Sequence, residues 1–163
     1  MRQQRQQELP AQRAQHVNPN KQRDRQDQRD QLGAYGERVA LMYLEESGYL
    51  LEAKNWRGQR GELDLIMRRD TLLVIVEVRT TSTRWLERPA EATPLKKQRQ
   101  VARCADEYLA QRHPRAPQVI DIRFDIIGVF TPSYTQFQGE LSALPDHVEL
   151  DHIEDAYHSP WAF

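Results

Sequence analysis

The chain has 163 residues, of which 29% are charged, and its formal net charge is −1. This length is enough for one domain with a hydrophobic core, and no apolar run is long enough to cross a membrane. The charge is unevenly distributed, because residues 139–163 carry six acidic and no basic side chains. A nucleic-acid partner is therefore neither excluded nor indicated by the net charge.

The single cysteine, Cys104, excludes an intramolecular disulfide and fits a reducing compartment. The N-terminus is polar and lacks the apolar core of a signal peptide. Together these features predict a cytoplasmic protein.

Residues 1–31 are rich in Gln and Arg, with ten glutamines and almost no large apolar side chains. Such a composition buries too little surface to offset the entropy of ordering, so it predicts a disordered tail. Its arginines could contact phosphates without sequence preference, although a solvated extension without function fits the composition better. The folded domain is expected over residues 32–157, followed by a short C-terminal tail, 158–163.

Apolar periodicity and turn residues predict the elements of this domain. A helix is expected over residues 32–46, because its apolar stripe is followed by Ser47 and Gly48, which favour a helix end. A second helix is expected to begin after Thr93, a good N-cap that is followed by proline, and to end near residue 111. Strands are expected over residues 49–56, 61–67, 72–79 and 119–130, with an edge strand and a turn within 148–157.

The segment from Gly61 to Arg79 predicts two apolar strands joined by a tight polar turn, and each strand carries a carboxylate, Asp64 or Glu77. Apolar strands with β-branched residues are usually buried, and an ionised carboxylate is costly there unless it is paired or bound to a metal. The two acidic side chains therefore need an explanation.

The register of this hairpin decides how the two carboxylates are related. With residues 69–70 at the tip, Asp64 lies opposite Ile75 and diagonal to Glu77. In a second register, Asp64 lies directly opposite Glu77. Both registers put the carboxylates on one face, because side chains alternate with period two, whereas a turn of odd length would separate them. Like charges at this distance repel, so a cation between them is the natural resolution, and Arg79 lies on the same face.

Three more groups could belong to the same site. Glu37 lies at the edge of the apolar stripe of the first helix, although a first-turn glutamate favoured by the helix dipole explains it better. Lys97 falls on the line of the buried stripe of the second helix, so its amine could point toward the acids, although a solvated charged face is the more common case. Arg84, beside Trp85, could stack on a base, although a tryptophan that covers the edge of the core is the more common case.

Three histidines near the C-terminus, His147, His152 and His158, invite a metal-site interpretation. Their spacings of five and six residues match no compact helical or strand pattern, so surface histidines are predicted. Cys104 lies beside the apolar stripe of the second helix and is expected to pack rather than to act as a nucleophile.

One motif pair stands out as specific, namely GELDLI at residues 61–66 followed by VEVR at residues 76–79. Further motif positions are Gly36-Glu37, Thr93, Lys96, Arg123-Phe124-Asp125, Ile153 and Asp155-Ala156-Tyr157. With the order of helices and strands, this pattern resembles the PD-(D/E)xK nuclease superfamily. It is most similar to the YraN-like family (UPF0102) of predicted endonucleases, which is related to archaeal Holliday junction resolvases. The resemblance covers roughly residues 32–157.

The resemblance implies an α/β fold with a restriction-endonuclease-like core, α-β-β-β-α-β, in which helices flank a central mixed sheet. It implies that Glu37, Asp64 and Glu77 are catalytic acids that bind Mg²⁺ or Mn²⁺, and that the metal activates a water to hydrolyse a phosphodiester. Arg79 would be the fourth catalytic residue, at the position where the superfamily usually has lysine. A guanidinium keeps its proton and cannot act as a general base, but it can stabilise negative charge.

Three functions stay open at this point. The first is a metal-dependent endonuclease acting on DNA, branched or junction DNA included. The second is a nucleic-acid-binding module with a nuclease fold and little catalysis, and the third is a scaffold or interaction protein that uses its Gln/Arg-rich tail. Junction resolvases act as dimers, so a homodimer is an open expectation. In the first two cases, Lys96 at the family's helix position, Lys97 on the helical face and Arg84 would contact the nucleic acid.

Overall fold

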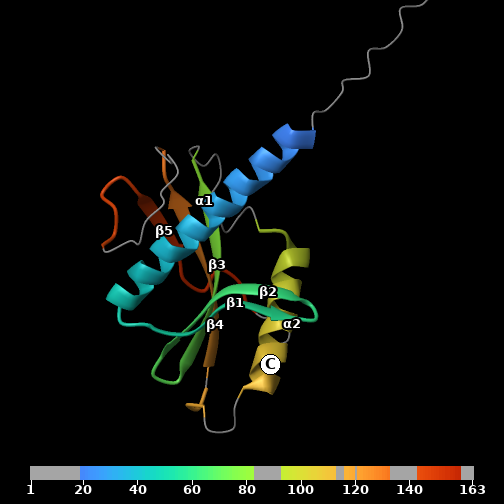
Figure 1. The fold of residues 1–163 in the computed structure, drawn as a ribbon. Coiled ribbons are helices and arrows are strands. Elements are labelled where there is room, and N and C mark those ends of the chain that lie inside the picture. The colour runs from blue at the N-terminus through green and yellow to red at the C-terminus, as the bar shows by residue number, and fades with distance from the viewer. Residues whose placement is uncertain (1–18, 83–92, 113–115, 120, 133–142, 159–163) are drawn as a thin grey trace, which may run out of the picture.

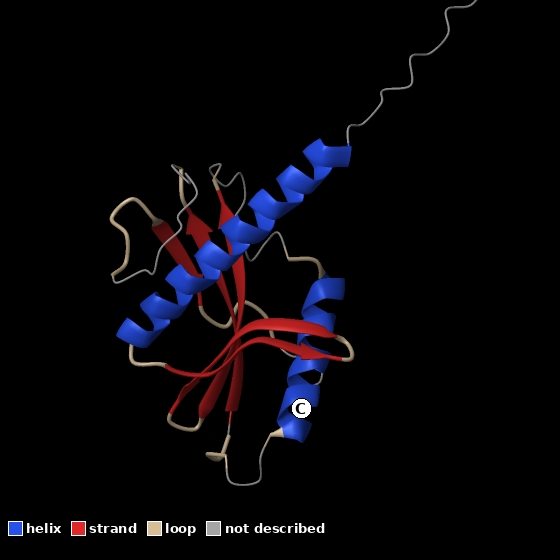
Figure 2. Cartoon of the chain, viewed as in Figure 1, coloured by secondary structure: helices blue, strands red, loops and turns tan. Residues whose placement is uncertain are grey.

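A computed structural model describes residues 19–82, 93–112, 116–119, 121–132 and 143–158 of the chain. They form one sheet with a helix against each of its faces (Figures 1 and 2). The elements are α1 (Pro19–Glu46), β1 (Leu50–Gly58), β2 (Gly61–Arg69), β3 (Leu72–Thr81), α2 (Leu95–Gln111), β4 (Asp121–Phe130) and β5 (Glu149–Ile153).

The sheet is mixed and has the strand order β1-β2-β3-β4-β5. The first three strands form an antiparallel meander, and β4 pairs in parallel with β3 after the chain has passed through α2. The edge strand β5 pairs antiparallel with β4. The predicted α/β class, the order α-β-β-β-α-β and the additional edge strand are therefore confirmed.

The two faces of the sheet carry separate hydrophobic cores. On one face α1 packs with Tyr35, Val39, Ala40 and Leu44 against residues of β2, β3 and β4. On the other face α2 packs with Val101, Ala102, Cys104 and Ala105. Cys104 is buried, as predicted.

The first helix is longer than its sequence pattern predicts. It begins at Pro19 rather than near residue 32, so residues 19–31 are helical although they were assigned to a disordered tail. Proline suits the first helical turn, and the following Gln, Arg and Lys residues are good helix formers. A low apolar content leaves a helix without a face to bury in a core but does not prevent it from forming, and side chains 23–30 are indeed exposed. Residues 1–18 lie outside the described part of the chain.

The β2–β3 hairpin adopts the second of the two predicted registers. Leu65 pairs with Val76 and Arg69 with Leu72, so Asp70 and Thr71 form the turn, with Asp70 at φ 55°. Continuing this register brings Asp64 level with Glu77. Ile66 lies on the same strand face as Asp64, and Ile75 lies on the same face as Glu77. Both isoleucines belong to the core under α2. The two carboxylates therefore face α2.

Candidate functional site

The two central strands of the hairpin separate at the acidic residues. The pairing of β2 with β3 ends at Leu65 and Val76, although β2 starts at Gly61 and β3 continues to Thr81. In Figure 1 the β1–β2 hairpin turns away from β3 here. The Val78 N–H, instead of continuing the ladder, donates to Asp64 Oδ2 at 2.8 Å. Asp64 is thus fixed at the fork between the strands.

Glu77 faces two cations at the same place. Lys97 Nζ, from α2, lies 3.2 Å from Glu77 Oε1, and Arg79 Nη2 lies 3.8 Å from the same oxygen. The Glu77 side chain is only 11% exposed, so water screens these pairs weakly. Among the described residues, Arg79 Nε is buried with no hydrogen-bond partner. A buried donor of this kind leaves a place for an anionic or water ligand.

The charge of Asp64 is poorly compensated by comparison. Burial raises the pKa of Asp64 to about 7, and the nearby charges of Glu77 and Glu37 act in the same direction. The hydrogen bond from Val78 and the charge of Lys97 oppose this shift without cancelling it. The three predicted acids are therefore coupled electrostatically, although each comes from a different element.

Close packing of α1 brings Glu37 toward this fork. The neighbouring Gly36 lies against Thr80 of β3, and a Cβ at position 36 would collide with the Thr80 side chain. Glycine therefore lets α1 approach β3 closely next to the position of Glu37. The sequence pattern, which favoured an ordinary first-turn glutamate, contained no information on this approach.

A metal could be held only in part by the side chains as they stand. Within the ranges that the structure describes, no three Asp, Glu, His or Cys side chains are close enough together to ligate one ion. Magnesium is commonly bound by one or two carboxylates, with waters and substrate phosphates as the other ligands. Asp64 and Glu77 fit that smaller donor set. A cleft of ≈ 540 Å³ opens at Glu77 and is lined by residues 77–81 and Lys97.

The remaining predicted site residues divide into two groups. Lys97 lies at the acids, as the helical-face argument proposes, whereas Lys96 is exposed one position away on α2 and lines a different cavity. Arg84 and Trp85 lie outside the described residues.

Tyr157 also belongs to this region, although the sequence analysis assigned it no role. Its ring stacks on Phe124, with ring centroids 5.3 Å apart. Burial raises its pKa strongly, and the charges of Glu77 and Asp64 contribute to the shift. The tyrosine therefore lies within electrostatic reach of both acids. The family-like ending around residues 153–157 was the available signal.

Behind the sheet, a buried ionic network holds the C-terminal segment that carries Tyr157. Asp125 is completely buried and accepts hydrogen bonds from Arg123 at 2.8 and 2.7 Å and from the Asp155 N–H at 3.0 Å. His152 Nε2 lies 2.9 Å from Asp125 Oδ2. Burial alone would raise the pKa of Asp125, but the bonds from His152, Arg123 and Asp155 lower it.

The prediction of surface histidines is wrong for His152, whose side chain is only 9% exposed. Pairing of β5 with β4 sets His152 opposite Ile127, two positions from Asp125. This contact joins positions 27 residues apart, and no spacing rule within the C-terminal segment could indicate it.

The fold and the site together define an α/β protein with a mixed sheet and a half-buried acidic cluster that faces a lysine. The chain belongs to the uncharacterised protein family UPF0102, whose model matches residues 36–129. This confirms the family suggested by the sequence motifs. The matched range contains Glu37, Asp64, Glu77 and Lys97.

Curated relatives share most of their length with this chain. A UPF0102 protein of Bacteroides thetaiotaomicron is 37% identical over 131 residues, which cover 80% of this chain and 95% of that protein. A UPF0102 protein of Beutenbergia cavernae is 41% identical over 101 residues, 62% of this chain and 83% of the relative. A UPF0102 protein of Frankia alni is 39% identical over 104 residues, which cover 64% of this chain and 84% of that protein.

As for membranes, none of the helices in the described ranges has the length and apolarity needed to span a bilayer.

Proposed function

We propose that this protein is a metal-dependent endonuclease that hydrolyses phosphodiester bonds in DNA. The observation that supports the proposal most is the pair of carboxylates, Asp64 and Glu77, on one sheet face at the fork between β2 and β3, opposite Lys97. The resemblance to PD-(D/E)xK nucleases, in which the mixed sheet bears the catalytic acids, supports the same assignment.

The chemistry of the donor set fits Mg²⁺ or Mn²⁺. Hard divalent cations prefer carboxylate oxygens, and Asp64 carries a charge that burial and its acidic neighbours leave poorly compensated. Asp64 and Glu77 would hold the ion, and the charge of Glu37, which acts on Asp64, would add to the attraction for it. When bound, the metal would supply an activated water and neutralise negative charge on the phosphate.

We assign to Lys97 the role of the catalytic lysine that the superfamily usually has at the position of Arg79. Arg79, at the usual lysine position, keeps its proton and cannot accept one from water. The Lys97 amine lies closer to Glu77 than the Arg79 guanidinium does, 3.2 Å against 3.8 Å. We assign Lys97 to charge stabilisation in the transition state. We assign to a phosphate oxygen the Nε of Arg79, which has no hydrogen-bond partner in the described part of the chain.

A second candidate function is a nucleic-acid-binding module with little catalysis. It is favoured by the two cations that already neutralise Glu77, and by the lack of three converging metal ligands among the described residues. In that case the cleft would bind a phosphate group without hydrolysing it.

One experiment separates the two functions. The protein is incubated with linear and branched DNA in Mg²⁺ or Mn²⁺, beside Asp64→Asn and a matched control, Asp70→Asn, in the exposed β2–β3 turn. We expect cleavage by the wild type and the control only, together with metal-dependent thermal stabilisation that Asp64→Asn abolishes. Retarded migration of DNA without cleavage, unaffected by metal, would support the binding module instead.

A further inference from the structure

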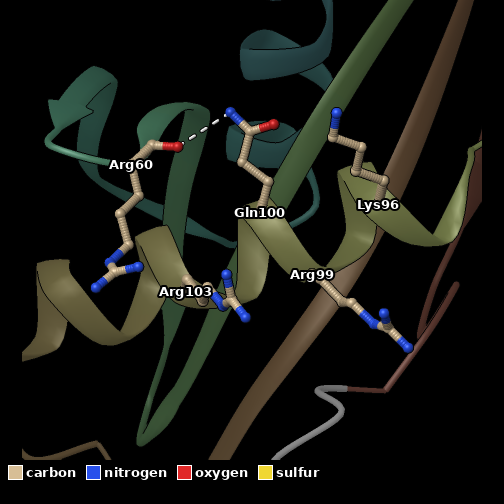
Figure 3. A pocket seen from close by; sticks show the side chains of 5 residues that line it. All are labelled: Arg60, Lys96, Arg99, Gln100 and Arg103. Atoms are coloured by element: carbon tan, nitrogen blue, oxygen red, sulfur yellow. Dashed lines mark hydrogen bonds between the residues drawn. The ribbon is translucent and has the colours of Figure 1, made fainter.

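A second cavity, of ≈ 520 Å³, lies between α2 and the turn that joins β1 to β2. Figure 3 shows Lys96, Arg99 and Arg103 projecting from successive turns of α2, while Arg60 approaches from the turn. All four side chains are exposed, and no carboxylate lines this cavity among the described residues. These four residues are called the basic track below.

The turn that carries Arg60 is held against α2 by specific contacts. Gln100 Nε2 donates to the Arg60 carbonyl at 3.0 Å (Figure 3). The Glu107 carboxylate accepts the Gln59 N–H at 2.9 and 3.0 Å. Gly61 has φ +148°, and a Cβ there would lie 2.6 Å from Gln100 Nε2. The cavity is therefore bounded by two elements fixed to one another.

The basic track concentrates positive charge near the start of α2. Lys96 lies in the first turn, where the helix dipole disfavours a cation, and α2 has no acidic residue there. Arg99 follows on the same face, whereas the carboxylates of Asp106 and Glu107 line an adjoining cavity with Arg60 and Arg103. An anionic ligand along the track would be attracted most strongly at its Lys96 end.

The spacing of the cations along the basic track fits a chain of phosphates. Lys96 and Arg103 are seven positions apart, about 10 Å along the helix axis. Each strand of a duplex carries one phosphate per ~3.4 Å of axis, so a helix lying along that axis would span about three phosphate steps. None of the described residues that line the cavity is aromatic, so none of them offers a ring on which unpaired bases could stack. This favours the backbone of a paired strand over a single strand.

We propose that the basic track binds the phosphate backbone of a nucleic-acid duplex and directs one strand to the acidic fork. Lys96, at one end of the track, is followed by Lys97, whose amine is 3.2 Å from Glu77. The track therefore ends one residue along α2 from the lysine that contacts the acids, although the two lysines line different cavities. The inference rests on the proposed function for the reaction at the fork, but binding and cleavage are measured separately.

The test uses the full chain and measures binding of a 20-bp DNA duplex in EDTA by fluorescence anisotropy over a range of salt concentrations. The track variant is Lys96→Ala/Arg99→Ala/Arg103→Ala. Its control, Arg25→Ala/Arg29→Ala/Arg38→Ala, removes three exposed cations from α1 and changes the net charge equally. Losing three phosphate contacts should reduce the salt slope by about 2.7 and the affinity roughly hundredfold near 0.15 M salt.

The proposal predicts this loss in the track variant and a much smaller change in the control. Equal losses in both variants, or tighter binding of the single strand than of the duplex, would overturn it. An RNA duplex of the same sequence, measured in parallel, identifies which backbone the track prefers, and the track variant must weaken binding of the preferred one.

Cleavage measured with Mg²⁺ distinguishes this proposal from the proposed function. If the wild type cleaves DNA and the track variant binds DNA as tightly as the wild type, the proposal for the track alone is overturned. If DNA binding depends on the track but no cleavage is observed, the proposed endonuclease function alone is overturned. A wild type that neither binds nor cleaves nucleic acid would overturn both.

Discussion

Asp64 is the residue whose environment is least favourable to its own charge. It is half-buried, it has two acidic neighbours, and its one strong compensating contact in the described structure is a backbone N–H. Residues in such positions lower the stability of the folded protein and are retained at functional sites. Substitution of Asp64 by a neutral residue should therefore raise the stability of the protein and lower its activity.

The raised pKa of Asp64 predicts a specific pH dependence of stability. The folded state keeps the proton up to about pH 7, whereas the unfolded chain loses it near the ordinary pKa of 3.8. Stability from this group is therefore full below pH 4 and lost as pH rises toward 7. Asp64→Asn should match the wild type near pH 4 and exceed it at pH 8 by on the order of 2–4 kcal/mol. Urea unfolding at both pH values measures this, and a constant difference would contradict it.

Lys97 and Lys96 provide a matched pair for the proposed chemistry. Lys97→Met removes the amine that contacts Glu77, and loss of one preorganised charge typically lowers kcat by roughly 10²–10³. Lys96→Met removes an exposed amine away from the acids and should weaken DNA binding with little change in kcat. Single-turnover cleavage rates at saturating DNA check both. Equal kcat for Lys97→Met and the wild type would exclude a catalytic role for Lys97.

At the scale of elements, the close approach of α1 to β3 determines how near Glu37 comes to the fork. Gly36 makes that approach against Thr80, while Gly33, one turn earlier, has no neighbour that a Cβ would meet. The same substitution at these two helical glycines should therefore have opposite effects.

Gly36→Ala should destabilise the protein by roughly 1–2 kcal/mol, because the added methyl group forces α1 away from the strand. Gly33→Ala should instead stabilise it by about 0.5–1 kcal/mol, since alanine is the better helix former. Urea denaturation of both variants measures the difference. A stabilised Gly36→Ala protein would mean that α1 does not dock as described.

At the scale of the whole molecule, the network around Asp125 connects both faces of the sheet. It ties β4 to β5, and the Ala156 N–H donates to the Phe124 carbonyl at 2.8 Å as the chain crosses toward α2. Tyr157 follows immediately and stacks on Phe124 near the acids. The buried ion pair thus positions a residue of the functional site on the opposite face.

Asp125→Ala should destabilise the protein by roughly 3–5 kcal/mol, because it leaves Arg123 and His152 without their buried acceptor. Glu154→Ala, which removes the exposed partner of Arg123, should cost less than about 1 kcal/mol. Since the pKa of Asp125 is lowered on folding, its contribution is full above about pH 4 and is lost as pH falls further. Wild type and Asp125→Ala should therefore converge in acid, as measured by thermal unfolding from pH 7 to pH 2.5.

The features that depend on local periodicity could be predicted from the amino-acid sequence. Side chains alternate along a strand, so Asp64 and Glu77 share a face in either even register, and the structure has one of those registers. Likewise, apolar spacings of three to four residues indicate the helices and their buried stripes, and spacings of two indicate the strands. The α/β order follows from these spacings. The family motifs lie in these same segments, and this is why they could be recognised.

Tertiary structure decided what depends on contacts between distant segments. It chose Lys97 over Lys96 as the neighbour of Glu77, a choice between adjacent positions about 100° apart on a helix. It buried His152 against Asp125 and extended α1 back to Pro19. It also separated β2 from β3 at Asp64, which converts a costly buried carboxylate into a candidate metal ligand. Such contacts are set by how whole elements dock, and no local pattern carries that information.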